Sequence, residues 1–291
     1  DFSELKSLPK LKELEIEGDD DYDDLWLLSD SITIPDTNLY ASLLSVLGKS
    51  DGDSITAAEI ANLTTLDLSR RGISDISGLE YAVNLTELNI QFNEINDLTP
   101  VASMPKLNSL NAGINLISDL SPLSSITELN TLSIDANNVT NLSPLENLTN
   151  LTYLSLSSNG SKFLDLEPLS SLTSLEFLRV SDNNIRDIAP LSSLVKLEHL
   201  DVNSNNVSDI SSLSNLTNLK YLYLKDNQIS DITSLSDLTN LEVLNLRENN
   251  IDDFSELKSL PKLKELEIEG DDDYDDLWLL SDSITIPDTN L

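Results

Sequence analysis

Leucines and other apolar residues recur along this chain with a spacing of 22 residues. Each repeat follows the pattern LxxLxLxxNxIxDIxxLxxLxx. Ten repeats open at leucines, all 22 residues apart except for one step of 24: Leu63, Leu85, Leu107, Leu129, Leu151, Leu175, Leu197, Leu219, Leu241 and Leu263. Repetition with this period predicts a solenoid, in which successive repeats stack on one another.

Each repeat contains an LxL core in which apolar and polar residues alternate. Successive side chains of a strand point to opposite faces, so Leu222 and Leu224 are predicted to face inward and Tyr223 outward. The strands of successive repeats are expected to pair in parallel into a curved sheet. The chain then returns through an IxDIxPL segment, whose prolines favour short 3₁₀ or extended turns: Pro100, Pro122, Pro144, Pro168 and Pro190.

An asparagine follows the strand in eight consecutive repeats, at the point where the chain turns. These residues are Asn93, Asn115, Asn137, Asn159, Asn183, Asn205, Asn227 and Asn249. A buried amide can bond the turn backbone of its own and of the next repeat, so we predict a structural asparagine ladder. Arg71 takes this place in the first repeat and Asp271 in the last, where the ladder is expected to end.

Residues 34–62, ahead of the first repeat, have a different pattern. Leu39, Leu43, Leu44 and Leu47 are spaced for one face of a helix, and the candidate signals for its ends are Asp36 or Thr37 at the start and Gly48 at the stop. Thr56 and Glu59 form a T-x-x-E capping box for a second short helix. We therefore predict a small helical cap that covers the open apolar end of the solenoid.

The repeats resemble the 22-residue leucine-rich repeats of bacterial internalin-like surface proteins, from about Leu63 to Asp271. Residues 34–62 look like the N-terminal helical cap of that family. The resemblance implies an α/β solenoid: a leucine-rich-repeat horseshoe with a parallel β-sheet on the concave face and 3₁₀ or extended turns on the convex side. It also implies an extracellular location at a bacterial cell surface.

The segment Asp1–Leu39 is identical to Asp253–Leu291. We interpret the chain as a window of a tandem array with a 252-residue unit; a tandem or permuted arrangement made for expression is the alternative. The expected parts are the end of a preceding unit (1–33), the helical cap (34–62), ten repeats (63–270), an acidic junction (271–285) and the start of the next cap (286–291). Trp26 and Trp278 would lie at the junction between units.

Charge narrows the range of partners. The chain has 51 acidic and 17 basic residues, a net charge of −34, which disfavours nucleic acid and anionic membranes. It has no cysteine, and no apolar run approaches the ~18 residues that span a membrane. In the junction, Asp271, Asp272, Asp273, Asp275 and Asp276 offer oxygen ligands for calcium. They lack the spacing of an EF-hand, and a solvated linker is the other interpretation of this run.

The concave face is the predicted place for ligand binding. Ring side chains and cations gather there in repeats five to nine: Tyr153, Phe177, Arg179, His199, Tyr221, Tyr223, Lys225 and Arg247. Aromatic residues beside arginine are typical of protein-binding hot spots, and rings also suit sugars. The alternative is that the rings only stabilise one another by cross-strand packing.

Nothing in the sequence indicates catalysis. There is no cysteine, G-x-S-x-G motif or phosphate loop, and we identify no base for His199. The first functional hypothesis is a non-enzymatic segment of a long extracellular fibre or adhesin, which would contact a protein or glycan on another cell or surface, its identical neighbouring units, or other copies of itself. The second is an internalin-like module that binds one protein or glycan ligand on its concave face.

Overall fold

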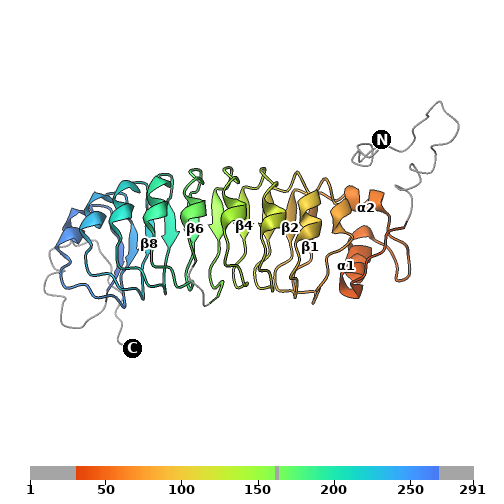
Figure 1. The fold of residues 1–291 in the computed structure, drawn as a ribbon, viewed down its shortest axis with the longest axis horizontal. Coiled ribbons are helices and arrows are strands. Elements are labelled where there is room, and N and C mark those ends of the chain that lie inside the picture. The colour runs from red at the N-terminus through yellow and green to blue at the C-terminus, as the bar shows by residue number, and fades with distance from the viewer. Residues whose placement is uncertain (1–30, 161–163, 269–291) are drawn as a thin grey trace, which may run out of the picture. The chain divides into compact units, whose positions relative to one another are not determined.

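The computed structural model describes residues 31–160 and 164–268, which are coloured in Figure 1. The chain forms two compact units, unit 1 (Asp1–Leu132) and unit 2 (Ser133–Leu291). Each unit is a solenoid of stacked repeats with its own buried core. The predicted calcium ligands 271–276, Trp26, Trp278 and the start of a next cap lie outside the described residues.

One repeat of unit 2 shows how the pattern folds. Its strand, β8 (Tyr221–Tyr223), is followed by a turn and a short 3₁₀ helix, η11 (Thr233–Asp237). The seven apolar consensus positions are at most 2% exposed: Leu219, Leu222, Leu224, Ile229, Ile232, Leu235 and Leu238. Burial of these side chains, at roughly 1.5–3 kcal/mol each, is the main favourable contribution to the fold.

Each strand is three residues long and pairs in parallel with the strand of the adjacent repeat in the same unit. In unit 1 the strands are β1 (Thr65–Asp67), β2 (Glu87–Asn89) and β3 (Ser109–Asn111), and β4 (Thr131–Ser133) spans the boundary to unit 2. In unit 2 they are β5 (Tyr153–Ser155), β6 (Phe177–Arg179), β7 (His199–Asp201), β8, β9 (Val243–Asn245) and β10 (Glu265–Glu267). The predicted parallel sheet is confirmed.

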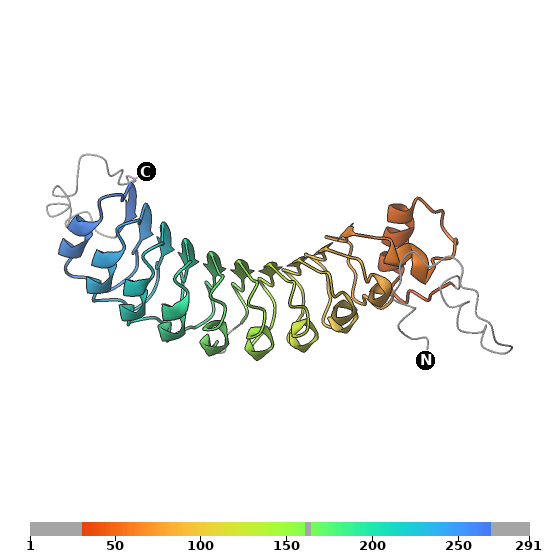
Figure 2. The same ribbon diagram turned by 90° about the horizontal axis from the view of Figure 1, so that it is seen from above.

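The side opposite the strands consists of 3₁₀ turns, as Figure 2 shows within each unit. Those of unit 1 are η4 (Leu79–Tyr81), η5 (Thr99–Ser103) and η6 (Ser121–Leu123). Those of unit 2 are η7 (Ser143–Leu145), η8 (Glu167–Leu169), η9 (Ala189–Ser193), η10 (Ser211–Asn215), η11 and η12 (Ser255–Ser259). All five predicted prolines stand in the first turn of such a helix, where a missing N–H costs nothing.

A side-chain oxygen of the IxDI segment, from Asp in all but one of the described repeats, accepts a hydrogen bond at the start of each 3₁₀ turn. The carboxylate of Asp209, for example, accepts a hydrogen bond from the Ser211 N–H at 2.9 Å. Asn141, which replaces the usual Asp, makes the same bond to Ser143 at 3.0 Å. The position therefore requires a side-chain oxygen rather than a charge.

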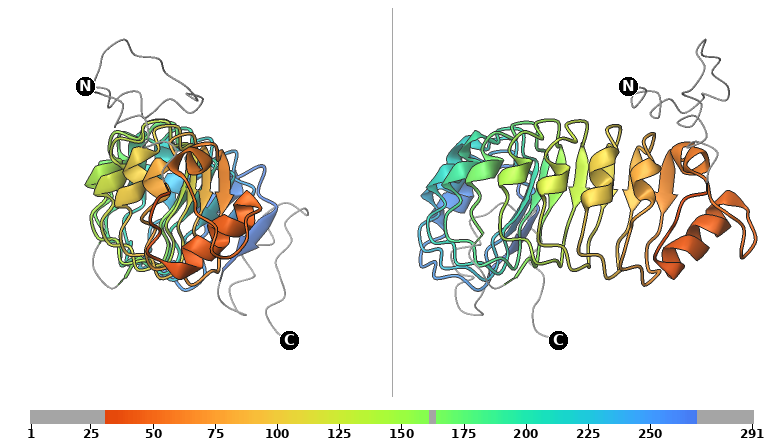
Figure 3. Two further views of the ribbon diagram at one scale, coloured as in Figure 1. Left: turned by 90° about the vertical axis from the view of Figure 1, so that its right-hand side faces the viewer. Right: turned by 45° about the vertical axis from the view of Figure 1, so that its right-hand side comes forward.

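Two helices begin unit 1, and the right panel of Figure 3 shows them next to the first repeats. Helix α1 (Thr37–Leu47) starts at the N-cap Asp36 and ends at Gly48, whose φ of 68° is the left-handed conformation of a helix stop. Helix α2 (Ala57–Ala61) has the predicted capping box between Thr56 and Glu59. Leu39, Leu43 and Leu44 are buried, so α1 contributes its apolar face to the end of the core.

The asparagine side chains form hydrogen bonds along the stack. Asn183 donates from Nδ2 to the carbonyl oxygens of Val180 in its own repeat and of Leu156 in the preceding repeat, at 3.0 and 2.9 Å. Its Oδ1 accepts from the Asn159 N–H of the preceding repeat at 2.8 Å. The bond to the asparagine's own repeat agrees with the prediction, but the bonds between repeats go to the preceding repeat rather than to the next one.

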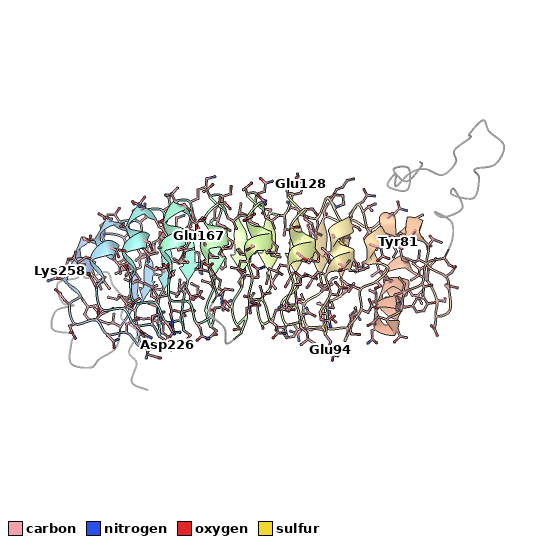
Figure 4. The ribbon with its side chains drawn as sticks, in the orientation of Figure 1. Tyr81, Glu94, Glu128, Glu167, Asp226 and Lys258 are labelled. Carbon is pink, nitrogen blue, oxygen red and sulfur yellow. The ribbon has the colours of Figure 1, made fainter. Side chains whose placement is uncertain are left out.

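Surface charge is spread over both edges of the repeats. Figure 4 shows Glu94 in unit 1 and Asp226 in unit 2 on the edge where the chain turns after its strand, and Glu128 on the opposite edge of unit 1. With a net charge of −34, the negative electrostatic potential of the chain extends beyond individual contacts. It disfavours the approach of polyanions.

Candidate binding surface on the strand face

The outward side chains of the strands form columns, because adjacent strands pair without a shift in register. We call this surface the strand face. In unit 2 the first column contains Tyr153, Phe177, His199, Tyr221, Val243 and Glu265 in consecutive strands. The second column, two residues further along each strand, contains Ser155, Arg179, Asp201, Tyr223, Asn245 and Glu267.

The rings of the first column stack on one another. Tyr153 and Phe177 have ring centroids 4.3 Å apart with an interplanar angle of 10°, and Phe177 and His199 are 4.2 Å apart at 18°. His199 also contacts two tilted rings, Tyr221 at 5.8 Å and Tyr223 at 5.3 Å. We call these five residues the ring stack. The spacing follows from the distance between neighbouring strands, which is about 4.8 Å.

Stacking leaves the ring edges rather than their faces for a ligand. Phe177 lies between Tyr153 and His199, so both faces of its ring are covered. Tyr221, at the other end, is the most exposed ring of the stack and is 37% accessible. Cross-strand packing of the rings is therefore real, and what remains for binding is a ridge of edges with the tyrosine hydroxyls.

A carboxylate and a guanidinium lie beside the ring stack. Arg179 Nε is 3.3 Å from Asp201 Oδ2, and Asp201 also accepts a hydrogen bond from the Asn203 N–H at 3.0 Å. Burial raises the pKa of Asp201, while Asn203 and Arg179 oppose the rise. An ion pair on a half-buried surface holds both side chains in place more than it stabilises the fold.

The surroundings of His199 lower its pKa. Burial in the ring stack lowers its pKa, the charge of Asp201 raises it, and Arg179 lowers it again, with a net decrease. The Asp201 carboxylate lies close enough to affect the pKa of His199, because residues two apart on a strand share a face. No hydrogen bond between these two side chains is among the contacts of the described residues, so Asp201 is not placed as a base for His199.

Two residues after each strand, Lys225 and Arg247 stand at equivalent positions of adjacent repeats, which we call the third column. These two cations differ in their partners. Lys225 Nζ forms an ion pair with Glu248 Oε1 at 3.0 Å. Arg247 stands in the adjacent repeat, and its backbone carbonyl accepts a hydrogen bond from the Asp226 N–H at 2.9 Å. The Arg247 Nε atom is buried and has no hydrogen-bond acceptor within residues 31–160 and 164–268. Lys225 and Arg247 thus lie at the end of the ring stack nearest Tyr223.

The strand face of unit 1 is polar and was not predicted as a site. A shallow hollow of about 390 Å³ is lined by Thr65, Asp67, Glu87, Asn89, Ser109 and Asn111, together with the edges of two leucines. Its side chains carry carboxylates, amides and hydroxyls, but no ring. The sequence contained a signal for this surface, because the first and third residues of every strand in unit 1 are polar.

The turn that follows each strand adopts a conformation that is rare for residues other than glycine. The residue before each ladder asparagine has φ between 51° and 58°: Phe92, Ile114, Ala136, Ser158, Asp182, Ser204, Asp226 and Glu248. Arg70 precedes Arg71 in the first repeat with φ 58°, and its guanidinium carbon lies 3.7 Å above the Phe92 ring. The left-handed conformation could not be predicted from the residue type, because the position holds different residues in different repeats.

A family comparison agrees with this geometry. The family model "Leucine Rich repeats (2 copies)" matches residues 83–125, 173–215, 195–237, 217–259 and 239–277. Among solved structures, the internalin InlF of Listeria monocytogenes is 31% identical with a TM-score of 0.63, over 87% of this chain and 88% of that one. The chain belongs to the internalin-like leucine-rich-repeat family.

Other internalins of Listeria monocytogenes are similar too. Internalin C2 is 30% identical with a TM-score of 0.61, over 82% of this chain and 100% of that one. InlJ is 25% identical with a TM-score of 0.65, over 80% of this chain and 54% of that one, and its functional domain includes a cysteine ladder. This internalin-like chain has no cysteine and carries asparagine at its ladder. No curated protein sequence matched it.

Leucine-rich-repeat domains of the internalin type generally bind proteins, and internalins are surface or secreted bacterial proteins. Within residues 31–160 and 164–268, no helix has the length and apolar character needed to cross a membrane. Over the same residues, no group of three or more His, Cys, Asp or Glu side chains is arranged for a metal ion. The predicted calcium ligands lie outside that range.

Proposed function

We propose that this internalin-like chain is a non-enzymatic binding module that recognises one protein through the strand face of unit 2. The observation that carries the proposal is the ring stack with its flanking charges. Aromatic rings and arginine are the residues that dominate protein-binding hot spots. Here they are held by neighbouring strands of one sheet, so little conformational entropy is lost when a partner binds.

The geometry favours a protein over a glycan. A sugar binds an aromatic residue by lying against the face of the ring, but the faces of Phe177 are both covered by neighbouring rings. Ring edges and tyrosine hydroxyls instead offer C–H and O–H groups, which suit the mixed apolar and polar surface of a protein. The exposed ring of Tyr221 is the expected first contact.

The site is not arranged for catalysis. His199 feels the charge of Asp201, but it is packed in the ring stack with a lowered pKa. Asp201 is already engaged by Arg179 and Asn203. The described ring contacts of His199 are Phe177, Tyr221 and Tyr223, which pack the imidazole into the ring stack.

The test is binding of the purified chain to a panel of intact bacterial and animal cells. The triple variant Tyr153→Ala, Phe177→Ala, Tyr221→Ala should lose at least tenfold in binding while its circular dichroism spectrum is unchanged. The matched control replaces Tyr81 and Val195, exposed apolar residues outside the strand face, by alanine and should bind like the parent. Protease treatment of the cells should abolish binding and glycosidase treatment should not.

Equal binding by the triple variant and the parent contradicts the proposal, and so does binding to none of the cells. Loss of binding after glycosidase treatment alone would favour a glycan ligand.

A second candidate function is a segment of a tandem extracellular adhesin or fibre, which the identity of Asp1–Leu39 and Asp253–Leu291 favours. Repeated binding units gain avidity through effective concentration, which a weakly binding module needs. In this proposal the acidic segment 271–276 and the Trp26 and Trp278 segments join consecutive units, with calcium as a candidate ligand of the carboxylates. Sequencing the complete gene tests it: a single copy of the 252-residue unit would exclude the array.

A further inference from the structure

The turns that follow the strands of unit 1 carry large apolar side chains that are exposed to solvent. Leu116 is 53% exposed, the highest value among the large apolar residues that the structure describes, and Ile114 is 38% exposed. Phe92, one repeat earlier at the position equivalent to Ile114, is partly exposed. In unit 2 the same position holds small or acidic residues, Asp182 and Asp226 among them. The apolar character is therefore specific to this edge of unit 1.

Ile114 keeps a conformation that is unfavourable for its residue type. A β-branched side chain rarely adopts a φ of 55°, and exposure means that burial returns little for it. Phe92 has a φ of 58° as well. Backbone strain of this kind is concentrated where residues make functional contacts, and exposed apolar patches mark interaction surfaces. Both observations point to something that covers this edge.

Two arginines border the apolar side chains. Arg70 and Arg71 are the only adjacent basic residues in the chain, and both are exposed. Within the described parts of the chain, neither arginine forms an ion pair. The Arg70 guanidinium lies 3.7 Å above the Phe92 ring, which leaves the N–H groups at its rim free to meet a carboxylate. We call the following five residues the turn edge: Arg70, Arg71, Phe92, Ile114 and Leu116.

The local charge of the turn edge is opposite to that of the chain as a whole. The three turns 69–72, 91–94 and 113–116 contain two arginines and one acid, Glu94, which Figure 4 labels on this edge. The net charge of the chain is −34. A basic and apolar surface on so acidic a protein is complementary to a segment that is acidic and apolar.

This chain contains such a segment. Residues 19–28 read DDDYDDLWLL, with five aspartates, no basic residue and a continuous apolar run at 25–28. They lie outside the described residues. The aspartates match the two arginines, because a carboxylate accepts two N–H groups from a guanidinium. The apolar run matches the exposed Ile114 and Leu116.

Residues 19–28 also precede the part of the chain that is fixed to the first repeat. The Asn38 side chain, in α1, donates a hydrogen bond to the carbonyl oxygen of Gly72 at 2.9 Å, and Gly72 directly follows Arg71. An extended chain covers about 3.3 Å per residue and neighbouring repeats are about 4.8 Å apart, so the segment is long enough to reach Leu116. A tethered segment docks at a high effective concentration, and weak contacts suffice.

We infer that residues 19–28 dock on the turn edge of unit 1, with their aspartates at the two arginines and the apolar run 25–28 on the three apolar side chains. The turn edge includes no residue of the ring stack, so this docking goes beyond the proposed binding of a protein partner and does not depend on it. In a tandem array, residues 19–28 would be the junction from a preceding unit. Docking would then hold that junction on the first repeats of the unit that follows.

Trp26 reports on the docking, because a covered indole is shielded from quenchers in solution. Trp278→Phe leaves Trp26 as the one tryptophan of the full chain. Acrylamide, with EDTA present to remove calcium, should quench Trp26 several-fold less than it quenches a synthetic peptide of residues 19–31. Raising the salt concentration should weaken the protection, because salt screens the contacts between aspartate and arginine.

Two variants in this background test the two halves of the turn edge. Arg70→Glu combined with Arg71→Glu reverses the charge, and Leu116→Asp removes the most exposed apolar contact. Each should raise the quenching nearly to that of the peptide while the circular dichroism spectrum is unchanged. The matched control is Arg186→Glu combined with Lys196→Glu, which reverses two exposed cations of unit 2 and should leave the quenching unchanged.

Quenching of Trp26 equal to that of the peptide would overturn the docking. Protection that survives both turn-edge variants would overturn it too, since another surface would then cover Trp26. Protection that is lost on dilution would assign the contact to a second copy of the chain instead. None of these results depends on the binding of cells or on the number of units in the gene.

The identical residues 271–280 provide an internal comparison, because they repeat the sequence of residues 19–28. With Trp26→Phe, Trp278 is the one tryptophan left. Its quenching should be the same with and without the turn-edge substitutions. If Trp278 responds to them and Trp26 does not, the second copy of the segment occupies the turn edge, and the assignment to residues 19–28 is wrong.

Discussion

The carboxylate of Asp36 joins the helical cap to the first repeat through Ser74. Its Oδ2 accepts hydrogen bonds from the Ser74 N–H at 2.8 Å and from the Ser74 hydroxyl at 3.1 Å, and also from the Asp75 N–H at 3.2 Å. Its Oδ1 accepts from the Leu39 N–H at the start of α1 at 3.0 Å. One side chain thus caps a helix and fixes that helix against a turn 38 residues further along the chain.

Replacing Asp36 by Asn should destabilise the cap by about 2–3 kcal/mol at pH 7, since hydrogen bonds to a charged acceptor are the stronger ones. Partial burial by itself raises the pKa of Asp36, but the bonds from Ser74, Leu39 and Asp75 lower it below the ordinary value overall. A carboxylate with a lowered pKa stabilises the fold above its ordinary pKa, and that contribution is lost as the pH falls through the lowered value.

The difference in stability between the parent and Asp36→Asn should therefore be constant from pH 7 to about pH 5 and shrink towards zero below pH 4. Urea denaturation followed by circular dichroism at each pH measures it. Taking the difference removes the general effect of acid on so acidic a chain. A difference that stays the same at pH 3 would show that the charge of Asp36 has no part in the contact.

Gly78 is required where the segment before α1 passes over the first 3₁₀ turn. Its φ is 102°, and a Cβ placed there would overlap Ile34 Cδ1. Gly78→Ala should cost roughly 2 kcal/mol, from left-handed strain and from displacement of Ile34. Gly52→Ala is the matched control, since Gly52 has φ 86° with nothing within 4 Å of the added Cβ. Urea denaturation should give a smaller cost at Gly52; equal costs would mean that the Ile34 contact is unimportant.

The cap could be predicted because its signals are local in the sequence. Asp36, Gly48, Thr56 and Glu59 act on backbone groups within a few residues, so a helix start or stop follows from residue type and spacing. The second role of Asp36, as acceptor for Ser74, could not be predicted in the same way. It depends on how α1 packs against the first repeat, which no local pattern encodes.

The columns of the strand face could likewise be predicted, since a constant repeat length fixes which residues become neighbours. The contacts that each of these side chains makes could not be predicted. Arg179 pairs with Asp201 while Arg247 is left with a buried Nε, although both are arginines on the same face. The ring stack was expected as a group of rings, but the coverage of both faces of Phe177 depends on side-chain rotamers.

Ile114 is strained by its position before a ladder asparagine. It is β-branched and has φ 55°, a left-handed conformation that is unfavourable for such a residue. Its side chain is 38% exposed, so burial offsets only part of that cost. Ile114→Asn should raise stability by about 1 kcal/mol, because Asn tolerates this conformation better. Leu116→Asn is the control, since Leu116 is a 53% exposed apolar residue outside the positive-φ positions. Thermal denaturation that shows the same gain for both variants would attribute it to lost surface hydrophobicity instead.

The asparagine ladder should be strongest where it is most buried. Asn183 is 1% exposed, and Asn183→Ala removes its Nδ2 bonds to the carbonyl groups of Leu156 and Val180. These carbonyls keep one ladder donor each, Asn159 and Asn205, but the buried Asn159 N–H loses its acceptor. We expect a cost of about 3–5 kcal/mol. Asn249 makes equivalent bonds to Leu224 and Leu246 but is half-buried, so water can replace them and Asn249→Ala should cost about half as much. Urea denaturation that ranks the two variants in the opposite order would contradict this account.

His199 offers a direct measure of the electrostatics of the binding surface, because it is the one histidine of the chain. Its pKa is lowered by burial, raised by Asp201 and lowered by Arg179. An NMR titration of the His199 ring protons should therefore give a midpoint below the ordinary value of about 6.5. Asp201→Asn should lower the midpoint further, whereas Arg179→Gln should raise it.

The lowered pKa of His199 also determines whether the fold gains or loses stability as the pH falls. The unfolded chain takes up a proton on His199 at a higher pH than the folded chain does, so stability is lost as the pH falls through about 6.5. His199→Phe keeps a ring in the stack but does not titrate, so the parent should lose stability relative to this variant between pH 7.5 and pH 5.5. If the parent instead gains stability relative to the variant as the pH falls from 7.5 to 5.5, the pKa of His199 is raised. The charge of Asp201 would then outweigh burial in the ring stack.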